Sequence, residues 1–122
     1  MGRSTAAQKA AKVLYVGYRS AALEERVKAL REEGFAVDWV EDVGAAILNL
    51  WHGGYAALVL GNLVPPADQR LLLREAPRKN PSIRTLTLHS TRYGNEPSAG
   101  AWVTIDSGVS GFVAALKSLV EV

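Results

Sequence analysis

Residues 55–61, YAALVLG, are the most apolar stretch of this 122-residue chain. A short apolar run that ends at a glycine predicts a strand buried on both faces of a sheet, as in parallel sheets covered by helices. Residues 12–17, KVLYVG, predict a second buried strand of the same kind. Residues 35–40, FAVDWV, alternate in polarity and predict an exposed or edge strand. These three strands define the first half of a predicted sheet.

Two helices are predicted between these strands. Ser20 is the expected N-cap of the first, which runs to Glu33 and ends at Gly34 because glycine readily adopts the left-handed conformation of a C-terminal cap. Asp42 is the expected N-cap of the second, which stops at the glycines 53–54. Apolar residues at helical spacing set the inner faces. They are Leu23, Val27 and Leu30 in the first helix, and Val43, Ile47, Leu50 and Trp51 in the second.

The alternation continues in the second half of the chain. The prolines 65–66 preset the start of a third helix that contains the leucines 71–73. Pro77 together with Pro81 is expected to end it, because proline lacks the N–H that continues a helix. Residues 83–89, IRTLTLH, predict a fourth strand.

The last third of the chain completes the pattern. Residues 90–100 contain two glycines and a proline and predict a loop rather than a helix. Residues 101–105, AWVTI, predict a fifth strand, and residues 109–120 predict an amphipathic helix. The core-facing residues of that helix are Phe112, Leu116 and Leu119 or Val120.

Strands that alternate with helices at this spacing predict an α/β fold with a doubly wound, five-stranded parallel sheet of the flavodoxin-like pattern. We expect residues 12–122 to form one domain and residues 1–11 to form a flexible N-terminal arm. Such sheets bind ligands beyond the carboxyl ends of their strands, near the switch in strand order. The candidate loops therefore follow Val16, Leu60, Leu88 and Ile105.

The charge balance argues against a nucleic-acid-binding domain. The chain has 14 Lys and Arg against 12 Asp and Glu, but outside residues 1–12 it has 11 bases against 12 acids. Residues 70–92 contain a basic group with Glu75 as its one acid, which we interpret as a solvated helix face followed by a loop. Weak nucleic-acid binding through this group is the lesser alternative. The group consists of Arg70, Arg74, Arg78, Lys79, Arg84 and Arg92.

Several other classes of protein are excluded by composition. The absence of cysteine excludes disulfides, thiol catalysis and thiolate metal sites. No apolar run approaches the roughly 18 residues of a membrane helix, and the first dozen residues lack the apolar core of a signal peptide. The two histidines, His52 and His89, lack metal-ligand spacing. We therefore expect a cytoplasmic domain without a structural metal or a membrane contact.

The first half of the chain resembles a known family. Residues 12–17, 23–50 (LEERVKALREEGFAVDWVEDVGAAILNL) and 55–66 (YAALVLGNLVPP) resemble the receiver domain of two-component response regulators, the CheY-like family. The most specific segments are REEGFAVDWVEDVGAAI and ALVLGNLVPP, and the likeness extends in order and length over most of residues 12–120. It implies the CheY-like form of the flavodoxin-like fold.

The resemblance also implies a phosphorylation site at the strand ends, where this sequence departs from the family. The family has an acidic pair after its first strand, which helps to hold magnesium, and Gly17 and Tyr18 match that pair. Asn62 matches the phosphoacceptor aspartate that ends the third strand. An amide is a poor nucleophile, and magnesium normally requires carboxylate oxygens. We therefore expect no aspartyl phosphorylation, no metal, no cofactor and no enzymatic activity.

The remaining family positions lie after the fourth and fifth strands. His89, followed by Ser90, matches the family's hydroxyl residue, and its lysine is matched by Ile105 or Asp106. A hydrolase built from His89, Ser90 and Asp106 is disfavoured because the chain lacks the G-x-S-x-G elbow. The family's fourth helix falls on residues 90–100, so we expect that helix to be shortened or absent, with a different partner surface or oligomer.

These features together predict a stand-alone pseudo-receiver that acts in signal transduction through protein contacts. Its expected partner is a sensor kinase or an output protein, and a homodimer is compatible with the resemblance. The alternative is a small-molecule or anion sensor that uses the altered pocket. Its expected contacts are Arg19, Asn62, His89 and Ser90.

Overall fold

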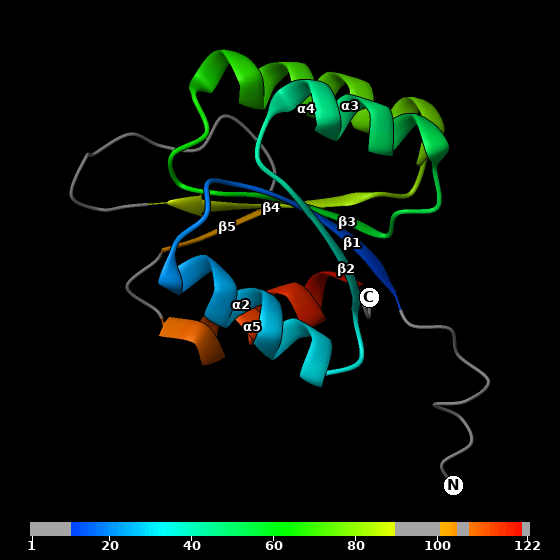
Figure 1. The fold of residues 1–122 in the computed structure, drawn as a ribbon. Helices are drawn as coiled ribbons and strands as arrows, with labels where there is room; N and C mark the ends of the chain where they lie inside the picture. The colour runs from blue at the N-terminus through cyan, green and yellow to red at the C-terminus, as the bar shows by residue number, and fades with distance from the viewer. Residues whose placement is uncertain (1–10, 90–100, 105–107, 121–122) are drawn as a thin grey trace, which may run out of the picture.

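A five-stranded parallel sheet with the strand order β2-β1-β3-β4-β5 runs through the molecule (Figure 1). The computed structural model describes residues 11–89, 101–104 and 108–120. Each neighbouring pair of strands is parallel. The α/β class with a parallel sheet is therefore confirmed. The strands are β1 (Lys12–Val16), β2 (Ala36–Val40), β3 (Ala57–Leu60), β4 (Arg84–His89) and β5 (Ala101–Thr104).

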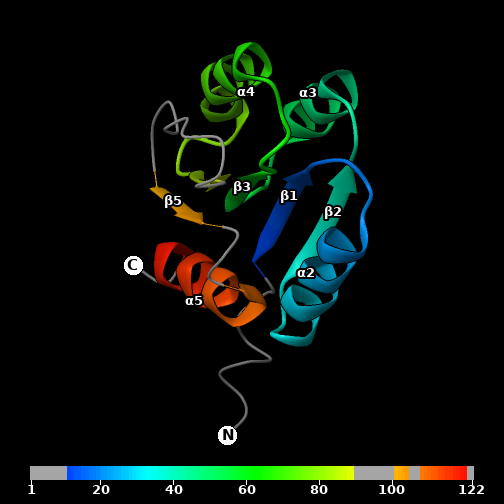
Figure 2. The ribbon, with the colours of Figure 1, turned by 90° about the vertical axis from the view of Figure 1, so that its left-hand side faces the viewer.

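Helices cover both faces of the sheet. Within the described residues α2 and α5 lie on one face, and α3 and α4 lie on the other (Figures 1 and 2). This arrangement follows from the right-handed crossover of parallel strands, because the chain leaves β1 toward β2 and later turns the opposite way toward β3, β4 and β5. The helices are α2 (Ala21–Glu32), α3 (Val43–His52), α4 (Pro66–Lys79) and α5 (Gly108–Val120).

Two apolar clusters, one on each face of the sheet, form the core. The central strands supply both, because successive side chains point to opposite faces. Tyr15 packs under α2 and α5, with its ring 6.0 Å from that of Phe112, whereas Leu14 and Val16 pack under α3 and α4. All four residues of β3 are buried, which confirms the predicted central strand, although the strand begins at Ala57 and not at Tyr55.

The predicted helix caps are observed. The Ser20 hydroxyl accepts a hydrogen bond from the N–H of Leu23 at 3.0 Å, and the Asp42 carboxylate accepts one from Ala45 at 2.8 Å. Gly34 follows α2 with a φ of 101°, which a residue with a side chain rarely adopts. The edge position of β2 is also as predicted, since β2 is the first strand in the sheet order.

Two helix predictions are wrong. Trp51 was expected on the inner face of α3 but is 54% exposed, because it lies about 100° around the helix from the buried Leu50. Pro77 was expected to help end the third helix, but α4 includes it and ends at Lys79. A proline in the last turn removes a single N–H bond, and the side chain of the following Asn80 bonds to the carbonyl of Ala76 at 3.0 Å.

Two other expectations fall outside the described residues. They concern the N-terminal arm and the loop over residues 90–100. Of the helices that the structure does describe, none has the length and hydropathy needed to cross a membrane.

Candidate functional site

The order of strands in the sheet reverses between β1 and β3. From β1 the chain crosses to β2 on one side, and from β2 it returns to β3 on the other. The two helices that lead away from this boundary lie on opposite faces of the sheet, so the carboxyl ends of β1 and β3 are where a ligand crevice forms in folds of this kind. Gly17 follows β1 directly, and Gly61 follows β3 directly.

Two glycines meet at this boundary. The N–H of Gly61 donates to the carbonyl oxygen of Val16 at 2.8 Å, and the N–H of Gly17 donates to that of Val40 at 3.0 Å. A Cβ on Gly61 would lie 3.2 Å from the Val16 oxygen and 3.4 Å from the Cα of Gly17. The two backbones therefore approach so closely that this part of the crevice has little room for a side chain on Gly61.

Asn62 lies one residue farther along, in the turn after β3. The N–H of Val64 closes that turn by donating to the carbonyl of Gly61 at 3.2 Å. Asn62 is half-buried there, and the residue that directly follows the strand is Gly61. Sequence reasoning did not single out Gly61, because the end of a four-residue strand cannot be placed to one residue from an apolar run. Neither residue carries a carboxylate.

A hollow of about 170 Å³ opens beside this turn. Gly17 and Tyr18 line it together with carboxylates from Glu41, Asp42 and Asp68. Tyr18 is 54% exposed and lies at its wall. Three acidic side chains make this hollow unfavourable for an anion. The apolar part of the lining comes from Val16, Val43, Val64, Pro65 and Leu72.

Two of the three acidic side chains at the hollow already have partners. The Asp42 carboxylate caps α3, and the Oε2 atom of Glu41 accepts a hydrogen bond from the N–H of Arg19 at 3.1 Å. In the described part of the chain, no three His, Asp or Glu side chains gather into a group that could hold a metal ion. The residues at the strand ends therefore do not fit the magnesium site that the resemblance would imply.

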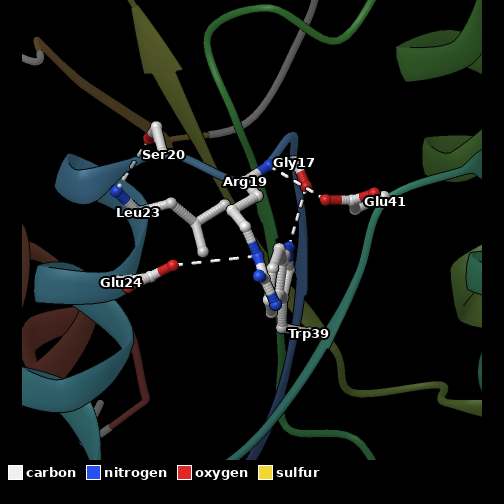
Figure 3. A network of polar contacts seen from close by, with 7 residues as sticks. All are labelled: Gly17, Arg19, Ser20, Leu23, Glu24, Trp39 and Glu41. Atoms are coloured by element: carbon white, nitrogen blue, oxygen red, sulfur yellow. Dashed lines mark hydrogen bonds and ion pairs between the residues drawn. The ribbon is translucent and has the colours of Figure 1, made fainter.

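Arg19 is held against the β2 edge of the sheet (Figure 3). Its guanidinium lies over the ring of Trp39, 5.2 Å from the ring centroid, and 3.7 Å from the carboxylate of Glu24. The indole N–H of Trp39 in turn donates to the carbonyl of Gly17 at 2.8 Å. The hollows that Arg19 lines contain Trp39 and not Asn62 or His89. Trp39 is thus a further residue at this site, and sequence reasoning did not identify it.

The structure brings together only part of the predicted pocket. Gly17 and Tyr18 line the hollow with the three carboxylates, whereas Asn62 and His89 do not line it. His89 is the last residue of β4 and is half-buried. Ser90 and Asp106 lie outside the described residues.

The same architecture occurs in many solved structures. A CheY-like response regulator receiver domain from Methylobacillus flagellatus matches with a TM-score of 0.72 and 19% identity, covering 90% of this chain and 98% of that one. A putative response regulator from Chloroflexus aurantiacus matches with a TM-score of 0.75 and 18% identity, covering 93% and 100%. This chain has the receiver fold. No protein-family model matches the sequence, and neither does any curated protein.

A further structure with the receiver fold contains a kinase. It is the complex of the histidine kinase ThkA with the response regulator TrrA, which matches with a TM-score of 0.71 and 18% identity, covering 89% of this chain and 97% of that one. Identities this low establish the receiver fold and not the function. The function must be argued from the residues at the strand ends.

Proposed function

We propose that this chain is a receiver-fold signalling module that acts through protein–protein contact without aspartyl phosphorylation. The observation that carries the proposal is the contact between Gly17 and Gly61, where a Cβ on Gly61 would lie 3.4 Å from the Cα of Gly17. A phosphoacceptor needs a carboxylate with free space in front of it at the strand ends. Here Gly61 has no side chain, and a Cβ at this position would already lie 3.2 Å from the carbonyl oxygen of Val16.

The chemistry of phosphoryl transfer supports the same conclusion. The reaction needs a nucleophilic carboxylate and a cation that bridges the phosphoryl oxygens and neutralises the charge that develops on them. Gly17, Gly61 and Asn62 provide neither, because a hydrogen atom or an amide replaces the carboxylate. Glu41 and Asp42 are the first carboxylates after β2, and both are engaged, because Glu41 accepts from the N–H of Arg19 and Asp42 caps α3.

The class of partner is proposed from the fold. Receiver folds occur in response regulators, and the ThkA–TrrA structure shows one such regulator in complex with a histidine kinase. For the present chain we infer a sensor kinase or an output protein as partner. The alternative role as a small-molecule or anion sensor has less support where the ligand is an anion, because Glu41, Asp42 and Asp68 surround the hollow at the strand ends.

Phosphorylation is tested directly with a small phosphodonor. The protein is incubated with acetyl phosphate and magnesium, and its intact mass is measured with and without hydroxylamine, which cleaves acyl phosphates. We expect no phosphoryl-sized mass gain. A hydroxylamine-sensitive gain would overturn the proposal, and so would a micromolar magnesium isotherm that Asp42→Asn abolishes. A rise of the melting temperature with inorganic phosphate would favour the sensor instead, since a ligand of the native state stabilises it.

A further inference from the structure

The outer face of α3 is apolar although this helix lies on the surface. Leu48 is 60% exposed and Trp51 is 54% exposed, and their spacing of three residues places them on one side of the helix. No Asp, Glu, Lys or Arg occurs in α3. By contrast, the exposed positions of α2 include five charged side chains, as is usual for a surface helix. They are Glu24, Glu25, Lys28, Arg31 and Glu32.

The side of α3 that carries Trp51 faces α4. Ile47, one turn before Trp51, packs in the same apolar cluster as Leu72 and Ala76 of α4. The opposite side of α3 carries Asn49, whose amide oxygen lies 3.4 Å from the hydroxyl of Tyr55. Figures 1 and 2 show α3 and α4 side by side on this face of the sheet. Trp51 is therefore exposed along the seam between the two helices.

Basic side chains border this seam on α4. A Cβ on Gly53, at the end of α3, would lie 3.1 Å from the backbone oxygen of Lys79, at the end of α4. Glu75 is one turn before Lys79 and so lies on the same side of α4. Its carboxylate pairs with Arg74 at 3.5 Å and with Arg78 at 3.7 Å, and these arginine side chains are 67% and 66% exposed. The seam thus has an apolar side and a basic side.

We propose that the exposed residues Leu48, Trp51, Arg74 and Arg78, here called the α3–α4 face, bind an amphipathic helix of a partner protein whose apolar stripe is flanked by Asp and Glu. This inference rests on the proposed function and names the surface and the chemistry of the protein contact. An apolar ridge beside arginines matches the helix-in-groove mode of recognition. Tryptophan and arginine are also the residue types that most often dominate interface energies.

The charge of α4 favours an acidic partner helix over a second copy of this chain on the α3–α4 face. Helix α4 carries four basic residues against two acidic ones, and one of those acids, Glu75, is shared between two arginines. A partner with acidic flanks would pair with the exposed guanidinium groups. A second copy of this chain would instead bring a second set of the same arginines to the contact.

The experiment uses the full chain and a designed helical peptide. The peptide has about 18 residues, long enough for partial helicity, with Leu along one face at i, i+3, i+4 and i+7 and with Glu and Ala elsewhere. A matched peptide carries Lys in place of every Glu. Backbone amide and indole NMR shifts of the protein are followed during titration. We expect the Glu peptide to shift resonances of α3 and α4, including the indole of Trp51, at millimolar concentration or below, and the Lys peptide to shift none.

Variants separate the surface from general effects of substitution. Trp51→Glu is expected to weaken binding about tenfold or more, as loss of a central aromatic anchor does. Leu63→Glu is the matched control, because Leu63 is 63% exposed in the turn after β3. Arg74→Gln combined with Arg78→Gln should weaken binding and its dependence on salt, whereas Lys28→Gln on α2 should not. Circular dichroism melting shows that each variant is folded.

Each contrary result overturns the proposal. No shift with the Glu peptide at millimolar concentration does so, as do equal shifts with both peptides or shifts confined to α2 and α5. Sedimentation that shows a dimer lost in Trp51→Glu would assign the face to a second copy. Binding to anionic phospholipid vesicles that is lost in the same variant would assign it to a membrane surface. The proposed function fails separately, through a phosphoryl mass gain measured without peptide.

Discussion

Gly61 lies against Gly17 across the boundary between β3 and β1, with its N–H bonded to the carbonyl oxygen of Val16 at 2.8 Å. Two glycines in this register leave no side chain between the carboxyl ends of the two strands at this point. Neither glycine has a positive φ, so what the backbone needs here is space and not an unusual conformation. The stability of the fold should therefore depend on the size of the residue at this contact.

Gly61→Ala is expected to lower the free energy of unfolding by about 1–3 kcal/mol, the usual cost of overpacking. The added Cβ would lie 3.2 Å from the Val16 oxygen and 3.4 Å from the Gly17 Cα, and neither backbone atom can move independently. Gly17→Ala is the matched control. Its Cβ would meet the side chains of Leu23 at 3.2 Å and Tyr15 at 3.3 Å and no backbone oxygen, so we expect a smaller loss there. Urea unfolding measures both, and an equal or smaller loss for Gly61→Ala would contradict the argument.

Tyr55→Phe is expected to remove part of the loss of stability at high pH. The Tyr55 hydroxyl donates to the Oδ2 atom of Asp38 at 2.7 Å. Burial, then the hydrogen bond to Asp38 and the negative charge of Asp38, raises the pKa of Tyr55 well above its usual value. Because the folded-state pKa is the higher one, the stabilisation is complete below the unfolded pKa of about 10 and is lost as the pH rises above it.

The phenylalanine keeps the ring over which the Lys12 ammonium lies, 4.6 Å from the centroid. At neutral pH the variant should lose about 0.5–1.5 kcal/mol, the net value of one hydrogen bond. Tyr18 is 54% exposed, so Tyr18→Phe should change neither the stability at neutral pH nor the loss of stability at high pH. Burial also raises the pKa of Tyr15, against the opposing effect of Arg26, so some alkaline sensitivity should persist. Unfolding curves from neutral to alkaline pH that are parallel for wild type and Tyr55→Phe would disprove the linkage.

Asn80→Ala is expected to be among the most destabilising polar substitutions, at about 2–4 kcal/mol, because it leaves the N–H of Tyr55 without this acceptor and removes two further hydrogen bonds to backbone carbonyls. The Asn80 side chain is buried and joins α3, α4 and the segment that leads into β3. Its oxygen accepts from the N–H of Tyr55 at 2.9 Å, and its nitrogen donates to the carbonyls of Leu50 and Ala76 at 3.0 Å each.

Asn49→Ala is the matched control for Asn80, since the half-buried Asn49 amide makes one backbone bond, to Ala45 at 2.9 Å. Asn49→Ala should lower the free energy of unfolding clearly less than Asn80→Ala does. Asn80→Asp should not rescue stability, because a carboxylate cannot donate to the two carbonyls. Thermal melting that places Asn80→Asp close to wild type would refute the assigned bonding.

Arg31→Ala is expected to promote self-association while changing stability by at most about 1 kcal/mol. Ala36 donates to the carbonyl of Ala11, and Val40 accepts from Gly17, so these residues of β2 face β1. Val37, of opposite parity, faces the open edge of the sheet, where the Nη2 atom of Arg31 donates to its carbonyl at 2.9 Å. The guanidinium thus covers part of an edge strand that other chains could pair with.

Light scattering at rising protein concentration measures this effect of Arg31. Lys28→Ala, on the same helix, removes an equal charge without touching the β2 backbone and should leave association unchanged. Equal association in the two variants would show that the positive charge, and not the covering of the β2 edge, prevents self-association.

Much of the fold was predictable because the controlling signals are local. The apolar run at residues 57–60, the caps at Ser20 and Asp42 and the left-handed Gly34 all depend on a few neighbouring residues. The burial of Trp51 was predicted wrongly because an amphipathic stripe has borders, and one helical step separates the buried Leu50 from the exposed Trp51.

The sequence predicted which residue types stand at the candidate site but not which of them are in contact. The absence of carboxylates at Gly17, Tyr18 and Asn62 is a fact of composition, and it led to the expectation of no phosphorylation, which the mass measurement tests. The sequence did not identify Gly61 as the residue that meets Gly17, because that depends on where a strand stops and on its register with another strand. Nor did it place Arg19 over Trp39.

The sequence by itself determined which segments become strands and helices, and in what order, because hydrophobic period and capping chemistry act over one or two turns of chain. The tertiary structure decided which distant residues meet. Gly17 with Gly61, Tyr55 with Asp38, and α3 with the basic side of α4 are juxtaposed by the order of parallel strands and the phase of each helix. Those contacts depend on packing across the whole sheet, so no local pattern encodes them.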